Sequence, residues 1–245
     1  MIHVPGGIGD RREQDAAEEL TLLLLGEELF EHWVGSVSAT PAARGGPLTV
    51  LNANSEERTA FPLTLLYEAV ESAIAGLKLG LSAEPATDGD DWVLFELSPE
   101  PAPDYAAQDD LVLASTRVPE LKKSFLRREP FFSGRFSNRG ELFLYLKYES
   151  AGASSEARLA QRSAIEAELV RALRAEHGAI VGAGLGIRYG YLDLALSDSS
   201  CVDQGILPAL RAADLPRQAW LLFCDTELAR EWIGVHPDTP EPFWG

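Results

Sequence analysis

The stretch from Glu141 to Asp198 constrains the fold most, because it predicts a strand, a long helix and a second strand in succession. The first strand, 141–149, has apolar side chains on both faces, which is typical of a strand inside a sheet that is covered on both sides. The helix, 156–176, is rich in Ala, Glu, Arg and Leu, and serines before it can cap its first turn. The second strand, 187–196, alternates again, and Gly190 within it indicates a bulge.

Two further elements follow this stretch. A second helix is expected over 203–213 and another strand over 218–224, so the order from Glu141 onward is β-α-β-α-β. A hairpin partner inside 187–200 would complete the element order of a ferredoxin-like sandwich. We therefore expect an α+β fold class, with mixed or antiparallel sheets and packed helices.

The first half of the chain shows a similar order. It predicts a helix over 14–33, then a short strand over 48–52, a helix over 62–79, an acidic turn and a strand over 92–97. The repeated order suggests an N-terminal α+β half, 1–115, and a C-terminal α+β half, 116–245, which would give two ferredoxin-like β-α-β units. The alternative is one continuous domain with a single mixed sheet.

One more hairpin is expected upstream of the strand at 141–149. The segment 131–136 is apolar and aromatic, and the turn that follows it contains Asn138 and Gly140. Both residue types tolerate positive φ, so a tight turn that joins two antiparallel strands is predicted here.

Composition and charge exclude several classes of protein. The formal net charge of −17 argues against DNA binding, which needs clustered Lys and Arg. The apolar run Leu22–Leu25 is far short of a membrane span, and no signal peptide is recognisable before it. Two cysteines do not make a disulfide framework. We expect a soluble, cytoplasmic protein, and because only four of the 21 basic residues are lysine, codon bias suggests a bacterial source.

The glycine-rich segment 181–187 resembles the start of a dinucleotide-binding fingerprint, but the match fails in detail. The third fingerprint glycine would fall at Ile187. The segment also follows a predicted helix and opens a predicted strand, whereas the fingerprint follows a strand and opens a helix. We interpret it as a helix-to-strand link and expect no cofactor.

Three residues are candidates for catalysis. Cys224 ends a buried strand and is followed by Asp225, at a position where active sites often lie. Glu149 and Asp225 both stand at strand ends, and carboxylates that converge there could act as acid and base or bind a metal. The alternative is that Cys224 is a small core residue and that an acidic protein places carboxylates at strand ends by chance. No metal signature is present, so no metal site is predicted.

The segment from Arg117 to Arg139 is basic in an otherwise acidic chain. The segment contains seven basic residues and only two acidic ones, Glu120 and Glu129, so it carries +5 and the rest of the chain −22. With interleaved phenylalanines it could bind an anion, an acidic partner or RNA. The alternative is that these cations pair with nearby carboxylates and that the phenylalanines are core. The seven candidate binding residues are Arg117, Lys122, Lys123, Arg127, Arg128, Arg135 and Arg139.

These observations favour a non-catalytic interaction protein that binds a protein partner, such as an inhibitor, an immunity-type protein or an adaptor. Strong acidity gives fast, salt-sensitive association with basic targets. One alternative is an enzyme or small-ligand protein with a site near Cys224, Asp225 and Glu149. The second alternative is anion or RNA binding through 117–139.

Overall fold

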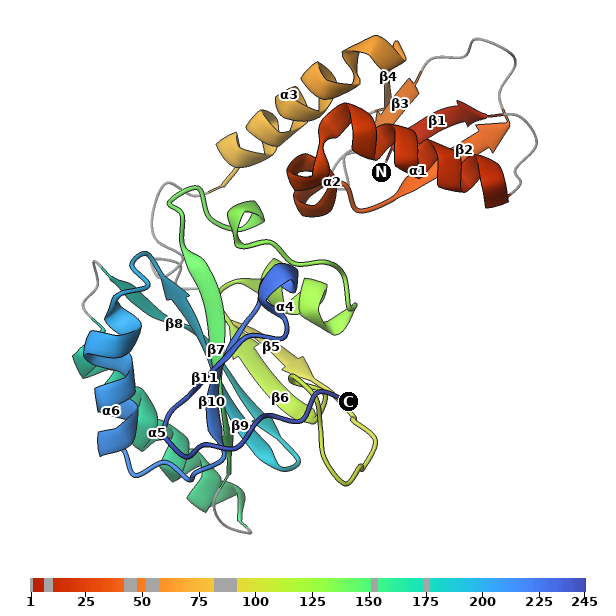
Figure 1. Cartoon of the computed structure of the whole chain (residues 1–245). Coiled ribbons are helices and arrows are strands. Elements are labelled where there is room, and N and C mark those ends of the chain that lie inside the picture. Colours follow the sequence, from red (N-terminus) through yellow and green to blue (C-terminus); the bar gives the residue numbers. More distant parts are fainter. Residues whose placement is uncertain are drawn as a thin grey trace. The chain divides into compact units, whose positions relative to one another are not determined.

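The protein folds into two compact units, residues 1–81 and 82–245 (Figure 1). Each unit has a sheet and helices of its own. The computed structural model describes residues 2–6, 11–41, 48–51, 58–81, 92–150, 154–173 and 177–245.

The first unit combines a four-stranded sheet with three helices. The sheet has the order β2-β1-β3-β4, with β1 parallel to β2 and the other pairs antiparallel. Buried apolar side chains on the helices and on β2 form its core. The elements are β1 (Ile2–Gly6), α1 (Arg11–Leu25), α2 (Glu27–Trp33), β2 (Val37–Pro41), β3 (Leu48–Leu51), β4 (Arg58–Phe61), a short 3-10 turn (Leu63–Leu65) and α3 (Leu66–Leu79).

The helix predicted over 14–33 is two helices, α1 and α2. Gly26 separates them with φ of 79°, a backbone conformation that residues with a side chain rarely adopt. The helix predicted over 62–79 is present as the 3-10 turn followed by α3. Both helical regions therefore lie where the apolar periodicity placed them, and the glycine decides where the first one breaks.

The second unit is built on a seven-stranded antiparallel sheet. Its strand order is β11-β10-β7-β9-β8-β6-β5. The strands are β5 (Val93–Glu96), β6 (Leu111–Thr116), β7 (Leu142–Glu149), β8 (Gly178–Gly186), β9 (Tyr189–Leu196), β10 (Ala219–Phe223) and β11 (Trp232–Gly234). The helices are α4 (Pro119–Leu126), α5 (Ser155–Ala172) and α6 (Leu207–Ala212), with single turns at Ser133–Arg135, Val202–Ile206 and Thr226–Leu228.

The predicted α+β fold class is confirmed. From β7 onward the order is β-α-β-β-α-β, with β8 and β9 forming the hairpin, while the ferredoxin-like assignment stays a prediction. The unit boundary falls between residues 81 and 82, whereas the sequence placed it between 115 and 116. The reason is that β5 pairs with β6, and β6 pairs with β8 of the same large sheet.

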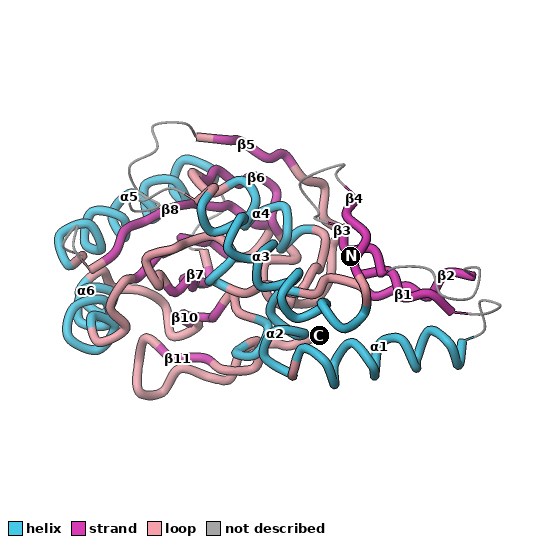
Figure 2. The backbone as a smooth tube through the Cα atoms, turned by 90° about the horizontal axis from the view of Figure 1, so that it is seen from above, coloured by secondary structure: helices cyan, strands magenta, loops and turns pink. Residues whose placement is uncertain are grey.

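Helices α5 and α6 cover one face of the large sheet (Figures 1 and 2). Ser154 caps α5, because its side chain accepts a hydrogen bond from the backbone N–H of Ala157. Ile165 and Leu169 of α5 pack against leucines of β7 and β9. The core on this face is therefore aliphatic, as the alternation along these strands predicts.

The opposite face of the sheet is aromatic and polar. Tyr145, Tyr189, Tyr191 and Trp220 lie on it, and residues 97–110, which we call the strap, pack over them together with α4. The C-terminal segment also closes this face, because the indole N–H of Trp220 donates to the carbonyl of Pro240 at 2.6 Å. Both faces of the central strands are thus covered, which explains why β7 and β9 read as apolar on both sides.

Three local predictions are wrong. The segment 131–136 forms a 3-10 turn and not a strand. The segment 181–187 is not a link, because β8 extends to Gly186 and pairs with β6 and β9. Gly190 marks no bulge, since the β7–β9 register is continuous through it; a Cβ there would lie 2.4 Å from the ring of Tyr148.

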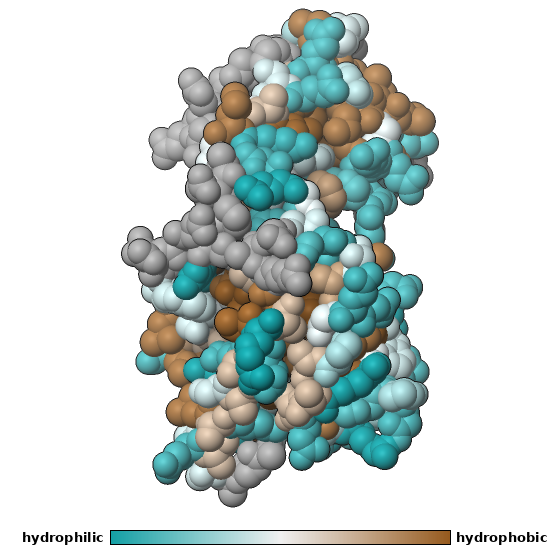
Figure 3. Space-filling model, turned by 90° about the vertical axis from the view of Figure 1, so that its left-hand side faces the viewer, coloured by the Kyte–Doolittle hydropathy of each residue, from teal (hydrophilic) through white to brown (hydrophobic). Residues whose placement is uncertain are grey.

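The face of the molecule drawn in Figure 3 carries both hydrophilic and apolar areas. None of the helices in the described part of the chain combines the length and the apolarity that crossing a bilayer requires.

Candidate functional site

The seven basic candidates do not form one surface. Lys122 points into the interior and is 1% exposed. Arg127 and Arg128 are exposed, with ion pairs to Glu129 at 3.9 Å and to Asp109 at 3.5 Å. The Arg117 guanidinium lies over the ring of Trp92, 4.9 Å from its centre.

Of the three other basic candidates, Arg135 and Lys123 are half-buried and Arg139 is exposed. Burial lowers the pKa of Arg135, and its guanidinium donates to the carbonyl of Pro130 at 3.1 Å.

Three of the four phenylalanines of this segment, Phe125, Phe131 and Phe136, pack in the core. Phe131 and Phe136 stack with their ring centres 4.6 Å apart, and both meet Phe143 of β7 edge-on. Phe125 meets Tyr145 in the same edge-on way. Rings that are held in this way are not a platform on which RNA bases could stack.

The three catalytic candidates lie at opposite ends of the sheet. Cys224 and Asp225 follow β10 at one end, while Glu149 ends β7 at the other, where its backbone N–H bonds to Gln218. The six residue-to-residue steps from Gln218 to Cys224 span about 20 Å in an extended strand. Glu149 therefore cannot act on one substrate together with Cys224 and Asp225.

Cys224 and Asp225 are both held within the protein. Burial, with Asp193 nearby, raises the pKa of the Cys224 thiol well above its usual range. Asp225 is buried and accepts hydrogen bonds from the backbone N–H of Ser133, at 2.7 Å, and from its hydroxyl. A thiol in this state is a weak nucleophile, and this carboxylate anchors a turn.

A buried polar cluster lies next to Cys224, between α4, the strap and β9. Lys122 forms an ion pair with Asp193, 2.8 Å between Nζ and Oδ2. Gln108 bridges the pair: its oxygen accepts from Lys122 at 2.8 Å and its amide donates to Asp193 at 3.0 Å. All three side chains are almost fully buried, and we call them the Lys122 cluster.

The glycines of β8 make room for this cluster. Gly182 pairs with Asp193 in the ladder, and a Cβ at Gly182 would lie 2.2 Å from the Asp193 carboxylate. A Cβ at Gly186 would likewise lie 2.3 Å from the carboxylate of Asp110. The glycines of the segment 181–187, which resembles the start of a dinucleotide-binding fingerprint, therefore leave room for buried carboxylates.

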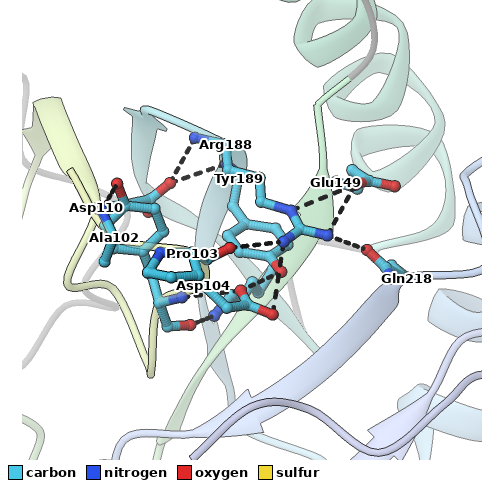
Figure 4. Close-up of polar contacts among 10 residues, drawn as sticks. Ala102, Pro103, Asp104, Asp110, Glu149, Arg188, Tyr189 and Gln218 are labelled. Carbon is cyan, nitrogen blue, oxygen red and sulfur yellow. Dashed lines mark hydrogen bonds and ion pairs between the residues drawn. The ribbon is translucent and has the colours of Figure 1, made fainter. Parts of the chain in front are cut away.

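A second polar group, the Arg188 cluster, holds the strap at the β8–β9 hairpin (Figure 4). The Arg188 guanidinium donates to Glu149 at 3.1 Å, to Gln218 at 3.1 Å and to the carbonyl of Pro103 at 3.3 Å. Burial acts to lower the pKa of Arg188, but Tyr189, Asp104 and Glu149 outweigh it and raise the pKa. Glu149 is thus one arm of an ion-pair network.

Asp110 fastens the end of the strap to the same hairpin. Its carboxylate accepts from the backbone N–H groups of Arg188 and Tyr189, at 2.7 and 2.9 Å, and from the Tyr191 hydroxyl. This buried carboxylate is therefore satisfied by three donors, and its role in the fold is to tie strap and sheet together.

Lys147 of β7 is a buried cation beneath the strap. Its ammonium donates to the carbonyl of Tyr105 and lies 4.2 Å from the ring centre of Tyr189. Burial lowers the pKa of Lys147 to about 8, against the opposing influence of Asp110 and Asp104. Unlike the exposed arginines, Lys147 is buried, and the strap covers its amine.

One open cavity of about 240 Å³ lies between the strap and α4. Leu97, Leu111 and Phe125 give it apolar walls, and Gln108, Asp109 and Arg128 are its polar lining. Typical small-molecule sites occupy about 300–1,000 Å³, so this one is small. No group of three metal-ligating side chains occurs in the described ranges.

The polar clusters left one signal in the sequence that the candidate sites did not use. Lys147 and Asp193 are single charges inside strands that are otherwise apolar on both faces. A charge in such a place must find an opposite charge or a hydrogen-bond partner on burial. This pattern could have identified Lys147 and Asp193 as buried charges that need partners, although it could not have named Lys122 as the partner of Asp193.

Comparisons with protein-family models, with curated proteins and with solved structures find no match to this chain.

Proposed function

We propose that this chain is a non-catalytic interaction protein that binds a basic protein partner, in the manner of an inhibitor, an immunity-type protein or an adaptor. The observation that carries the proposal is the surface of α1 and α2. No Lys or Arg occurs between Gln14 and Trp33. Six exposed carboxylates lie on these two helices, and we call them the acidic helix surface: Asp15, Glu18, Glu19, Glu27, Glu28 and Glu31.

Apolar side chains accompany these carboxylates. Leu22, Leu23 and Leu24 are all exposed, and Leu23 is 75% accessible. Single exposed leucines are ordinary, but three within one helical turn leave apolar surface on more than one side of the helix that a partner could remove from water. A partner that presents cations around an apolar patch would match both features of this surface.

The charge pattern favours fast association. Residues 1–81 carry 12 acidic and five basic residues, which gives −7, and the remaining residues carry 26 and 16, which gives −10. A field of one sign steers an oppositely charged protein and raises its association rate, and salt screens this effect over about 10 Å at 0.1 M. The association rate with a basic partner should therefore fall as salt rises.

The rival functions receive less support from the geometry. An enzyme site would need Cys224, Asp225 and Glu149 together, and the sheet holds Glu149 at its other end. An anion or RNA surface over 117–139 would need its cations exposed to solvent, whereas the Lys122 side chain is buried. The cavity beside the strap would suit only a small molecule.

A charge-reversal experiment tests the proposal. The wild type and a triple variant, Glu27→Lys, Glu28→Lys and Glu31→Lys, are used in parallel to isolate partners at low salt, and association rates are then measured at rising salt. The triple variant should lose the partner. A control that reverses three exposed carboxylates elsewhere, Glu100, Asp203 and Glu231, has the same net charge and should retain it.

Two outcomes would contradict the proposal. One is a partner that the triple variant and the control retain equally well. The other is an association rate that does not change between low and high salt, because an acidic surface that guides a basic protein must be screened by ions.

A further inference from the structure

Strand β5 forms an edge of the large sheet. It pairs with β6 on one side, and no described strand pairs with its other side. Trp92, Val93 and Leu94 are exposed there, and Leu94 is 60% accessible. The edge residues Trp92–Glu96 contain neither proline nor lysine, the residues with which proteins often protect such edges.

The hydrogen-bond pattern shows which groups face outward. Leu97 donates its backbone N–H to Val112 of β6, in register with the pairs Phe95–Ala114 and Val93–Thr116. In an antiparallel ladder, residues alternate between facing the neighbouring strand and facing away. Leu94 and Glu96 therefore direct their N–H and C=O groups toward the open edge.

We propose that β5 pairs with β5 of a second copy of this chain, antiparallel and around a two-fold axis at Leu94. This register brings Leu94 opposite Leu94 of the second copy and Val93 opposite Phe95. It also brings Trp92 opposite Glu96 of the second copy. The outward-facing residues Leu94 and Glu96 then meet outward-facing residues, so that their backbone groups bond across the axis.

Charge complementarity selects this register. Trp92 lies opposite Arg117 in the continuation of the β5–β6 ladder, and the Arg117 guanidinium sits 4.9 Å from the centre of its ring. Glu96 of the second copy would extend the same row on the same sheet face, two strand spacings, or about 10 Å, from Arg117. A shift of two residues would instead place Glu96 opposite Leu94, a charge against an apolar side chain.

The pairing is isologous, so the row formed by Arg117, Trp92 and Glu96 of the second copy occurs twice. Each copy contributes Glu96 to one row and Arg117 to the other, and Leu94 lies at the axis with apolar neighbours on both sides. A single apolar strand that meets itself in this way forms a closed pair of molecules and not an open fibre, because the pairing uses the one edge that each copy offers at β5.

Sedimentation velocity on the full chain tests this inference. The wild type should be dimeric, and Leu94→Lys should weaken the dimer by at least about tenfold, since two like charges would face each other at the axis. Val170→Lys alters a similarly exposed apolar residue, 63% accessible, on α5 of the same unit and should leave the dimer unchanged. Circular dichroism of each variant confirms that the fold is retained.

Charge exchange distinguishes this register from any other contact. Glu96→Arg and Arg117→Glu should each weaken the dimer, and the two together should restore it, because the symmetry places the two positions in one cross-strand row, on either side of Trp92. A monomeric wild type, a dimer that Leu94→Lys does not weaken, or a double variant no stronger than the single ones would overturn the inference. A monomer would leave the edge to an extended segment of another protein.

Discussion

Removing one partner of the buried Lys122–Asp193 ion pair should destabilise the second unit strongly. Both side chains are at most 2% exposed, so Lys122→Met would leave the Asp193 carboxylate in the interior without its cation. Breaking a buried ion pair costs about 3–5 kcal/mol. The Gln108 amide still donates to Asp193, which favours the lower end, about 3 kcal/mol. Chemical denaturation measures it: at about 2 kcal/mol per molar urea, the midpoint should fall by about 1.5 M.

Two comparisons decide whether the reasoning holds. Arg162→Met breaks the half-exposed pair with Glu166 on α5 and should cost about 0.5 kcal/mol or less. A triple variant, Lys122→Met, Asp193→Leu and Gln108→Leu, leaves no buried polar group unpaired and should recover most of the loss. If Lys122→Met costs no more than Arg162→Met, the buried pair does not stabilise this face of the sheet.

The remaining predictions concern other buried or half-buried groups of the second unit. Gly182→Ala should cost about 1–3 kcal/mol in urea denaturation, because its Cβ would lie 2.2 Å from the Asp193 carboxylate, whereas Gly205→Ala, whose Cβ would meet its nearest neighbour at 3.5 Å, should cost less than half as much. Burial lowers the pKa of Lys147 from 10.5 to about 8, so between pH 8 and 10 the unfolded chain binds more protons than the folded one; stability should rise across this window by an amount on the order of 2 kcal/mol, and in Lys147→Met this rise should be absent. Arg188→Met removes the side-chain bonds to Glu149, Gln218 and Pro103, and hydrogen exchange in residues 99–110 should become faster than in wild type, while exchange in α5 should not change. Thiol-reactive reagents should modify Cys201 well before Cys224, because burial raises the pKa of the Cys224 thiol further than that of Cys201; mass spectrometry of the peptides would show the order.

The sequence predicts the central strands and α5 well because their apolar pattern is local. β7 and β9 lie within one or two residues of their expected bounds, and Ser154 caps the helix as its position suggests. The pattern fails where long-range contact decides the outcome. Residues 131–136 are apolar because their rings pack on Phe143, and nothing local distinguishes this from a strand.

Long-range contacts also explain why the sequence does not give the unit boundary of the structure or the buried polar clusters. β5 looks like the end of the first half, yet its partner is β6, and the next strand in the sheet, β8, lies more than sixty residues further along the chain. From the sequence, the segment around Gly182 is interpreted as a helix-to-strand link, and only the ladder partner of Gly182, Asp193, shows why a glycine is needed there. Both Lys122 and Asp193 are ordinary charged residues by themselves, and only the fold brings them within 2.8 Å.

The interior also explains where the acidity of the protein must act. The buried charged residues in the described part of the chain are Asp110, Lys122, Glu141, Lys147, Asp193 and Asp225. Two cations among four carboxylates give −2, so −15 of the formal −17 remains for all other residues. Burial therefore removes little of the excess negative charge, and the buried carboxylates Asp110, Asp193 and Asp225 already have donors at hydrogen-bond distance. An excess of charge that the buried residues of the described ranges do not neutralise acts through solubility, repulsion of other anions and attraction of cations. Of these effects, only the attraction of cations can select a basic partner, which is why such a partner should be sought at the acidic helix surface.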